Sequence, residues 1–110
     1  MLNEHTARIR VLNDRLRQGL IGGRVHITPG VAALGADKAG EAWRAVSSFT
    51  DFSPSNDPYG EHDFGAFTLG HTQIFWKIDY LDPSLGGGAL DPADEATCVR
   101  VLTIMLAEEY

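Results

Sequence analysis

The stretch "DFGAFTLGHTQIFWKIDY", residues 63–80, decides the fold because it has the pattern of a β-hairpin. Two runs rich in aromatic and β-branched residues flank the dipeptide Gly70-His71, and a glycine in the first position favours a two-residue turn. In the register that this turn imposes, one face of the hairpin collects an almost entirely apolar set: Gly65, Phe67, Leu69, Thr72, Ile74, Trp76 and Ile78. We therefore expect this face to pack on the core.

The N-terminal half predicts two helices and a strand. Apolar steps of three and four residues predict a helix that ends at Gly19, with the stripe Leu2, His5, Ile9, Leu12 and Leu16. The alternating run "GGRVHIT", residues 22–28, predicts a short strand with Val25 and Ile27 on one face. Asp37 can cap a second helix, whose inner face would hold Ala39, Ala42, Trp43 and Val46.

The C-terminal run "LDPADEATCVRVLTIMLAEEY", residues 90–110, predicts a third helix. Asp91 would cap it, Pro92 would take its first position, and the helix would span 93–108. Its residues are apolar around most of its circumference, so we expect it to be central or covered by a partner. A homodimer through this helix is the predicted assembly, and Cys98 within it would be a buried thiol.

Together these elements predict a small α+β domain of residues 1–110. It would have a three-stranded, mostly antiparallel sheet with a hairpin at about 62–80, packed by the N-terminal, middle and C-terminal helices. The chain has 110 residues, of which 44% are hydrophobic and 22% charged, as in ordinary folded soluble proteins. No apolar run is long enough to span a membrane, the first residues do not resemble a secretory signal, and a single cysteine suits a reducing cytosol. We expect a cytoplasmic protein.

The candidate site is the stretch "DPYGEHDFG", residues 57–65, at the end of a long loop. Extending the hairpin register backwards places His62 opposite Asp79 and on the same face as Lys77. A carboxylate beside a histidine is a common way to fix the tautomer of a catalytic base, so these three are the catalytic candidates. The candidates for ligand binding in and beside the loop are Asp57, Tyr59, Glu61 and Asp63.

Plainer explanations of the same residues stay open. A cross-strand ion pair would tie the loop to the sheet, and carboxylates in a glycine- and proline-rich loop commonly bond to its own backbone. The sequence has no signature of a serine or cysteine nucleophile, a phosphate-binding loop or a helical metal-binding histidine pair, so neither metal nor cofactor is predicted. Nucleic acid is not expected either, because four helical arginines (Arg8, Arg10, Arg15 and Arg17) are a weak phosphate footprint on a chain of net charge −6.

Three motifs, "NDPYGEHDFGAF", "IFWKIDY" and "RVLTIMLAEEY", resemble the bacterial family called domain of unknown function 3768. The resemblance extends from "RIRVLNDRLR" to the C-terminal tyrosine and implies a short, stand-alone cytoplasmic protein of the kind found in alphaproteobacteria and on mobile elements. It implies no activity and no site residues. We therefore expect a non-enzymatic protein-interaction module, with a small hydrolase or a ligand- or metal-binding protein built on His62, Asp79 and Lys77 as the alternative.

Overall fold

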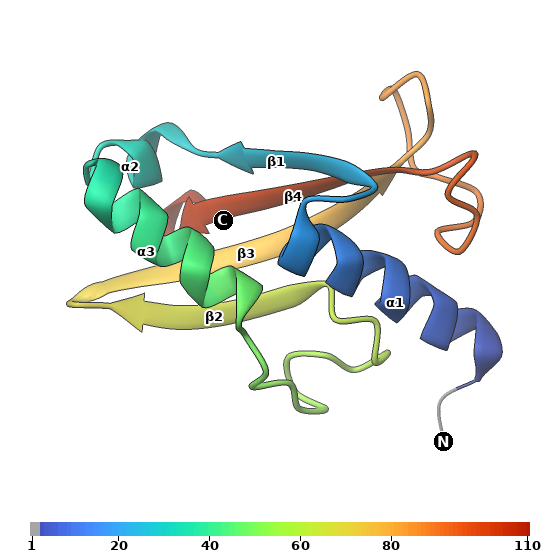
Figure 1. Ribbon diagram of the computed structural model, residues 1–110, viewed down its shortest axis with the longest axis horizontal. Coiled ribbons are helices and arrows are strands. Elements are labelled where there is room, and N and C mark those ends of the chain that lie inside the picture. The colour runs from blue at the N-terminus through green and yellow to red at the C-terminus, as the bar shows by residue number, and fades with distance from the viewer. Residues whose placement is uncertain (1–2) are drawn as a thin grey trace.

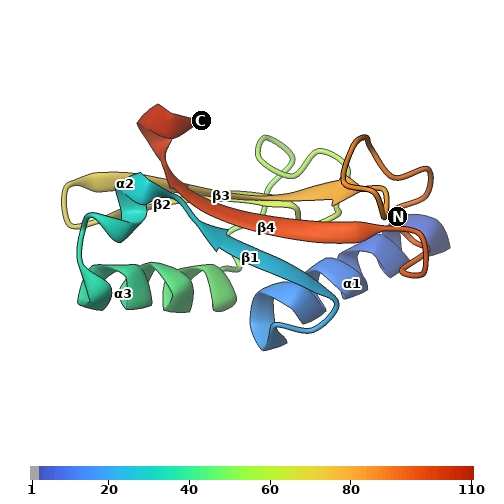
Figure 2. The same ribbon diagram turned by 90° about the horizontal axis from the view of Figure 1, so that it is seen from above.

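The computed structural model describes residues 3–110 and has two layers, with the two long helices on one face of a four-stranded sheet (Figure 1, Figure 2). In chain order the elements are α1 (Glu4–Gly19), β1 (Gly23–Ile27), α2 (Pro29–Ala32), α3 (Ala36–Ser47), β2 (Phe64–Leu69), β3 (Thr72–Leu81), β4 (Val99–Leu106) and the 3-10 turn η1 (Ala107–Glu109). The strand order is β1-β4-β3-β2, in which β1 is parallel to β4 and the other pairs are antiparallel.

The predicted hairpin is confirmed in its register. Leu69 pairs with Thr72 and Phe64 with Lys77, and Gly70 has the positive φ of 64° that the tight turn requires. The inner face of β3 presents three buried side chains to the helices: Ile74, Trp76 and Ile78. Alternation along the strand therefore specifies which face is buried, as expected for a sheet with one covered face.

The predicted C-terminal helix is wrong, because residues 99–106 form strand β4 in the middle of the sheet. The apolar run has a physical explanation as a strand: β4 lies between β1 and β3, and both of its faces are largely shielded. Leu102 and Ile104 face the helices, while Met105 on the other face is only 3% exposed. Asp91 does not cap a helix; its carboxylate accepts from the backbone N–H of Ala93 in a turn.

The other predicted elements are confirmed with small changes. Helix α3 packs on the core through Ala42 and Val46, but its N-cap is Gly35 rather than Asp37. The stripe of α1 buries Ile9, Leu12 and Leu16; His5 is exposed and bonds to Asp91, and Leu2 lies outside the described residues. The sheet has four strands rather than three, because residues 99–106 form strand β4, and β1 joins the sheet through a parallel pair with β4.

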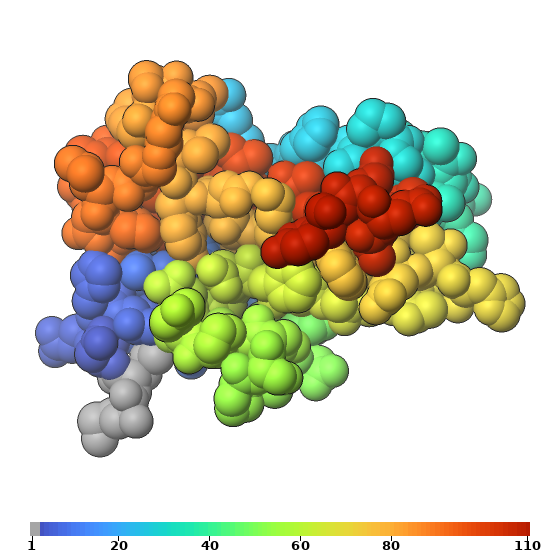
Figure 3. Space-filling model, turned by 180° about the vertical axis from the view of Figure 1, so that it is seen from behind, coloured from blue at the N-terminus to red at the C-terminus, as the bar shows by residue number. Residues whose placement is uncertain are grey.

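Neither of the two long helices covers the outer face of the sheet, where the short 3-10 turn η1 lies (Figure 2). Figure 3 shows this side, with the segment after β3 at one end and the C-terminal residues at the other. Phe64, Phe75 and Tyr110 pack edge to face there, with ring centroids 5.4–6.0 Å apart. The predicted homodimer has no C-terminal helix to use, so self-association stays a prediction that would need a different surface.

Candidate functional site: the cleft of the 50–63 loop

The long loop between α3 and β2 holds its shape through its own turn-forming residues. The side chain of Asn56 accepts from the N–H of Ser53 at 2.8 Å and donates to the carbonyl of Asp51 at 2.9 Å. The backbone N–H of Asp57 donates to the carbonyl of Ser53 at 2.8 Å, and the backbone N–H of Gly60 donates to the carbonyl of Asp57 at 3.1 Å. Asparagine and aspartate favour such turns because their short side chains can replace backbone partners.

Helix α1 holds the far end of the loop. The Nε of Arg10 donates to the carbonyl of Gly60 at 2.7 Å, and the side-chain amide of Asn13 donates to the carbonyl of Glu61 at 3.0 Å. The Nδ1 of His62 lies 3.0 Å from a carboxylate oxygen of Asp14. Three successive loop residues therefore bond to one helix, which gives an irregular segment a fixed position.

His62 points away from the place that the hairpin register predicted. Strand β2 begins at Phe64, and His62 adopts a left-handed backbone with φ of 57°, which turns its side chain toward α1. Its ring stacks on Phe52 with centroids 3.8 Å apart, and its carboxylate partner is Asp14 rather than Asp79. A positive φ at a non-glycine residue costs free energy and persists only where the surroundings enforce it.

Lys77 and Asp79 do lie together, on the outer face of the sheet. Their side chains form an ion pair of 3.0 Å and are 38% and 44% exposed. An exposed pair of this kind contributes little to stability. The predicted cluster of His62, Asp79 and Lys77 therefore does not form, because the histidine lies on the helical side of the sheet.

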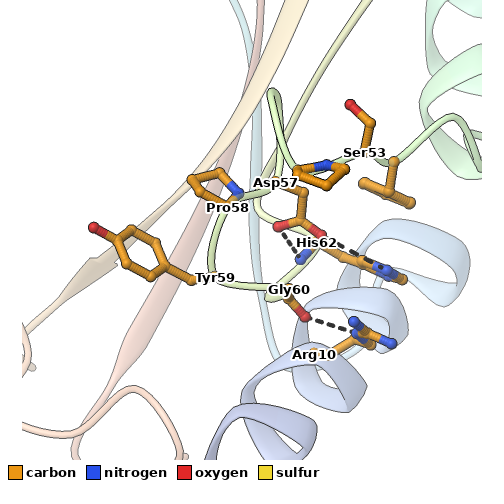
Figure 4. Close-up of a pocket in the computed structure, with 9 residues that line it drawn as sticks. Arg10, Ser53, Asp57, Pro58, Tyr59, Gly60 and His62 are labelled. Carbon is orange, nitrogen blue, oxygen red and sulfur yellow. Dashed lines mark hydrogen bonds and ion pairs between the residues drawn. The ribbon is translucent and has the colours of Figure 1, made fainter. Parts of the chain in front are cut away.

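A cleft of about 550 Å³ opens beside His62 (Figure 4). It is lined by part of α1 and the loop: Arg10, Phe52, Ser53, Pro54, Asp57, Pro58, Tyr59, Gly60 and His62. The carboxylate of Asp57 accepts from the backbone N–H of His62 at 3.2 Å, and its second oxygen lies 3.9 Å from Nε2 of the same residue. Tyr59 projects outward and is 77% exposed (Figure 4). Of the predicted ligand-binding residues, Asp57 and Tyr59 line the cleft.

The other two predicted ligand-binding residues, Glu61 and Asp63, belong to a polar cluster between α1 and the sheet. The hydroxyl of Tyr80 donates to Glu61 at 2.9 Å and accepts from Asn13 at 2.8 Å, and the guanidinium of Arg100 lies over the Tyr80 ring. Burial, with the charges of Glu61 and Asp57, raises the pKa of Asp63 to about 6. Burial also raises the pKa of Tyr80, which keeps it a hydroxyl donor.

Replacing Asp63 by asparagine should stabilise the protein above pH 6. The pKa of the carboxyl is about 6 in the folded protein and about 3.9 in the unfolded chain. Protonated Asp63 therefore favours the folded state at low pH, and this contribution to the free energy of unfolding is lost as the pH rises to about 6. The asparagine side chain would be neutral at every pH. Because Asp63 is only half-buried, we expect Asp63→Asn to gain about 1 kcal/mol at pH 8 and nothing at pH 4.

Urea unfolding of both proteins at the two pH values measures this difference. Asp51→Asn is the matched control, because Asp51 is an exposed carboxylate in the same loop. It should leave the free energy of unfolding unchanged within about 0.5 kcal/mol at both pH values. A destabilised Asp63→Asn variant at pH 8 would show that the charged form of Asp63 is required in the fold.

Two residues of the site, Arg10 and Asp14, were not predicted to lie beside the loop. Their spacing contains a usable signal: Arg10, Asp14 and Arg17 follow one another at steps of four and three, on one side of α1. A helical side with alternating charges can face a loop of mixed charge. The sequence gives no indication of which loop, since Asp14 and His62 are 48 residues apart.

Two further classes of feature are not found in the part of the chain that the structure describes. Residues 3–110 contain no group of three or more histidine, cysteine, aspartate or glutamate side chains placed to hold a metal ion. None of the described helices has both the length and the apolarity needed to cross a membrane.

Comparison with known proteins gives one match. Residues 27–109 match the model of the family described as "Protein of unknown function (DUF3768)". The matched part includes the whole 50–63 loop and strands β2 to β4, and it leaves out α1. No curated protein and no solved structure matches this chain.

Proposed function

Because the chain belongs to the DUF3768 family, whose description names no activity, we propose from the site that it is a non-enzymatic protein-interaction module. Its binding surface would be the cleft of the 50–63 loop, with Tyr59 and Arg10 as the principal contacts. The observation that carries the proposal is an exposed tyrosine and a part-buried arginine at a cleft whose loop is held in place by hydrogen bonds.

The order of the loop supports binding because it lowers the entropic cost of association. Arg10, Asn13 and Asp14 bond to three successive loop residues, and the Phe52 ring packs on His62. A surface that is already in place loses little conformational freedom when a partner arrives. Loops that are positioned by a rigid scaffold are the usual location of binding residues.

The residue types also favour a protein partner. Tyrosine and arginine are enriched among the few interface residues that supply most of the binding free energy. Tyr59 exposes 77% of its surface without packing on the core, while Phe49 and Phe52 supply the aromatic packing that fixes the loop. No fold requirement explains a tyrosine at that position, which suits a contact residue.

Selection of a phage-displayed random heptapeptide library on the folded protein tests the proposal. We expect selected peptides to bind the native chain and to lose at least about tenfold in affinity with Tyr59→Ser, since truncating a central contact residue costs about 2 kcal/mol. Tyr110→Ser is the matched control, because Tyr110 has a similar exposure of 75% but lies on the outer face of the sheet. Failure to select any peptide, or equal loss with both variants, would overturn the proposal.

A further inference from the structure

We infer that the cleft binds a carboxylate placed next to an apolar side chain, and that the guanidinium of Arg10 is the carboxylate receptor. This inference rests on the proposed function and names the chemistry of the partner segment. An acidic side chain and the C-terminal carboxylate of a partner present the same group to the protein. The inference follows from which charges in the cleft are already paired and which are not.

Arg10 is oriented but not saturated. Its Nε donates to the carbonyl of Gly60 at 2.7 Å, which fixes the plane of the guanidinium against the loop (Figure 4). Within residues 3–110, Nη1 and Nη2 of Arg10 have neither a hydrogen-bond acceptor nor an ion-pair partner. Two N–H groups in a planar fork match the two oxygens of a carboxylate.

The acidic residue nearest to Arg10 in the cleft does not occupy this receptor. The side chain of Asp57 is 4% exposed, and its oxygens are directed to His62. Asp14, on the same helix, is paired with Arg17 at 2.8 Å and with His62 at 3.0 Å. The charge that an incoming group meets in the cleft is therefore positive, although the loop contains several carboxylates.

The remaining lining explains the apolar neighbour of the carboxylate. Phe52, Pro54 and Pro58 line the cleft together with Arg10 and Asp57, and Tyr59 borders it with its ring turned outward. A small apolar side chain next to the carboxylate would cover these surfaces and exclude water from the ion pair, which strengthens it. A highly acidic partner is not favoured, because the whole chain carries a net charge of −6.

Titration of the ¹⁵N-labelled protein with two capped tetrapeptides tests the inference. One peptide contains leucine followed by glutamate, and the other has glutamine in place of the glutamate. We expect amide shifts at residues 52–62 with the glutamate peptide and at least about tenfold weaker binding of the glutamine peptide, since a hydrogen-bonded charge pair supplies about 1.5–3 kcal/mol. A third peptide with a C-terminal leucine carboxylate separates the two sources of the group.

Variants of α1 identify the receptor. Arg10→Gln should weaken binding of the glutamate peptide by about tenfold and leave binding of the glutamine peptide unchanged, whereas Arg8→Gln should change the affinity for neither peptide. Arg8 is a suitable control because it lies on the same helix and pairs with Glu95 at the surface. Equal affinity for the two peptides, or binding that survives Arg10→Gln, would overturn the inference. Tyr59-dependent binding of selected peptides without any carboxylate preference would leave the proposed function intact.

Discussion

Arg17→Met should destabilise the protein by about 3–5 kcal/mol, which is the range for removing one partner of a buried charge network. The side chain of Arg17 is 2% exposed and lies between α1, α3 and the core. Its Nη1 donates to the carbonyls of Val46, Ser47 and Phe49, at 2.9, 3.3 and 2.8 Å. Methionine would fill similar space but would leave the carbonyls of Ser47 and Phe49 without this donor, whereas the carbonyl of Val46 would still accept from the N–H of Phe49 at 3.3 Å.

The position of those carbonyls explains why the effect should be large. Val46 and Ser47 end helix α3, where unpaired carbonyls and the negative end of the helix dipole favour a cation. Phe49 begins the long loop, so the same guanidinium also fixes where the loop leaves the helix. Its Nη2 bonds to Asp14, which in turn holds His62. One side chain thus connects three segments.

Urea unfolding at pH 7 measures the loss, with Arg15→Met as the matched control. Arg15 lies two residues earlier, is 39% exposed and reaches Glu95 only at 3.7 Å, so its replacement should cost less than about 1 kcal/mol. The free energy of unfolding of Arg17→Lys should fall between those of the native protein and Arg17→Met, because a single ammonium cannot reproduce the planar fork of the guanidinium. A loss of less than about 1 kcal/mol for Arg17→Met would contradict this role.

Arg17 also shows where prediction from sequence stops. Its position on the flank of an amphipathic helix predicts a solvated arginine, and nothing local indicates that the end of another helix covers it. The same holds for His62, whose partner Asp14 is remote in sequence. Long-range polar contacts have no periodic pattern, so sequence can suggest the residues of the cleft but not their partners.

Local sequence patterns were sufficient to predict the buried face of an element where only one of its faces is buried. The hairpin register follows from alternation and from Gly70, and the inner faces of α1 and α3 follow from helical spacing. Strand β4 was predicted as a helix because a strand shielded on both faces shows no alternation. Val99, Val101 and Thr103 favour a strand, but the Asp91-Pro92 start signal favours a helix, and only the pairing with β1 and β3 decides between them.

Gly65→Ala should destabilise the protein by about 2 kcal/mol, although alanine is ordinarily better than glycine in a strand. Gly65 is opposite Trp76 in the hairpin and faces the helices. A Cβ atom at this position would meet the Trp76 indole and would lie 2.8 Å from Cε1 of Phe49. Both rings are buried and pack edge to face with centroids 5.6 Å apart, so neither can move without disturbing the other.

The matched control is Gly40→Ala in helix α3, where the nearest atom is the flexible Nη1 of Arg44 at 3.5 Å. That variant should gain about 0.5–1 kcal/mol in urea unfolding, because alanine favours helix and its methyl group meets no fixed atom.

If the clash with the indole is the cause, Trp76→Leu should relieve it, since leucine lacks Nε1 and Cε2, the indole atoms nearest to the new methyl group. In the double-mutant cycle, Gly65→Ala should then cost at least about 1 kcal/mol less in the Trp76→Leu background than in the native chain. An unchanged cost would assign the loss to the strand backbone and not to the packing of Trp76.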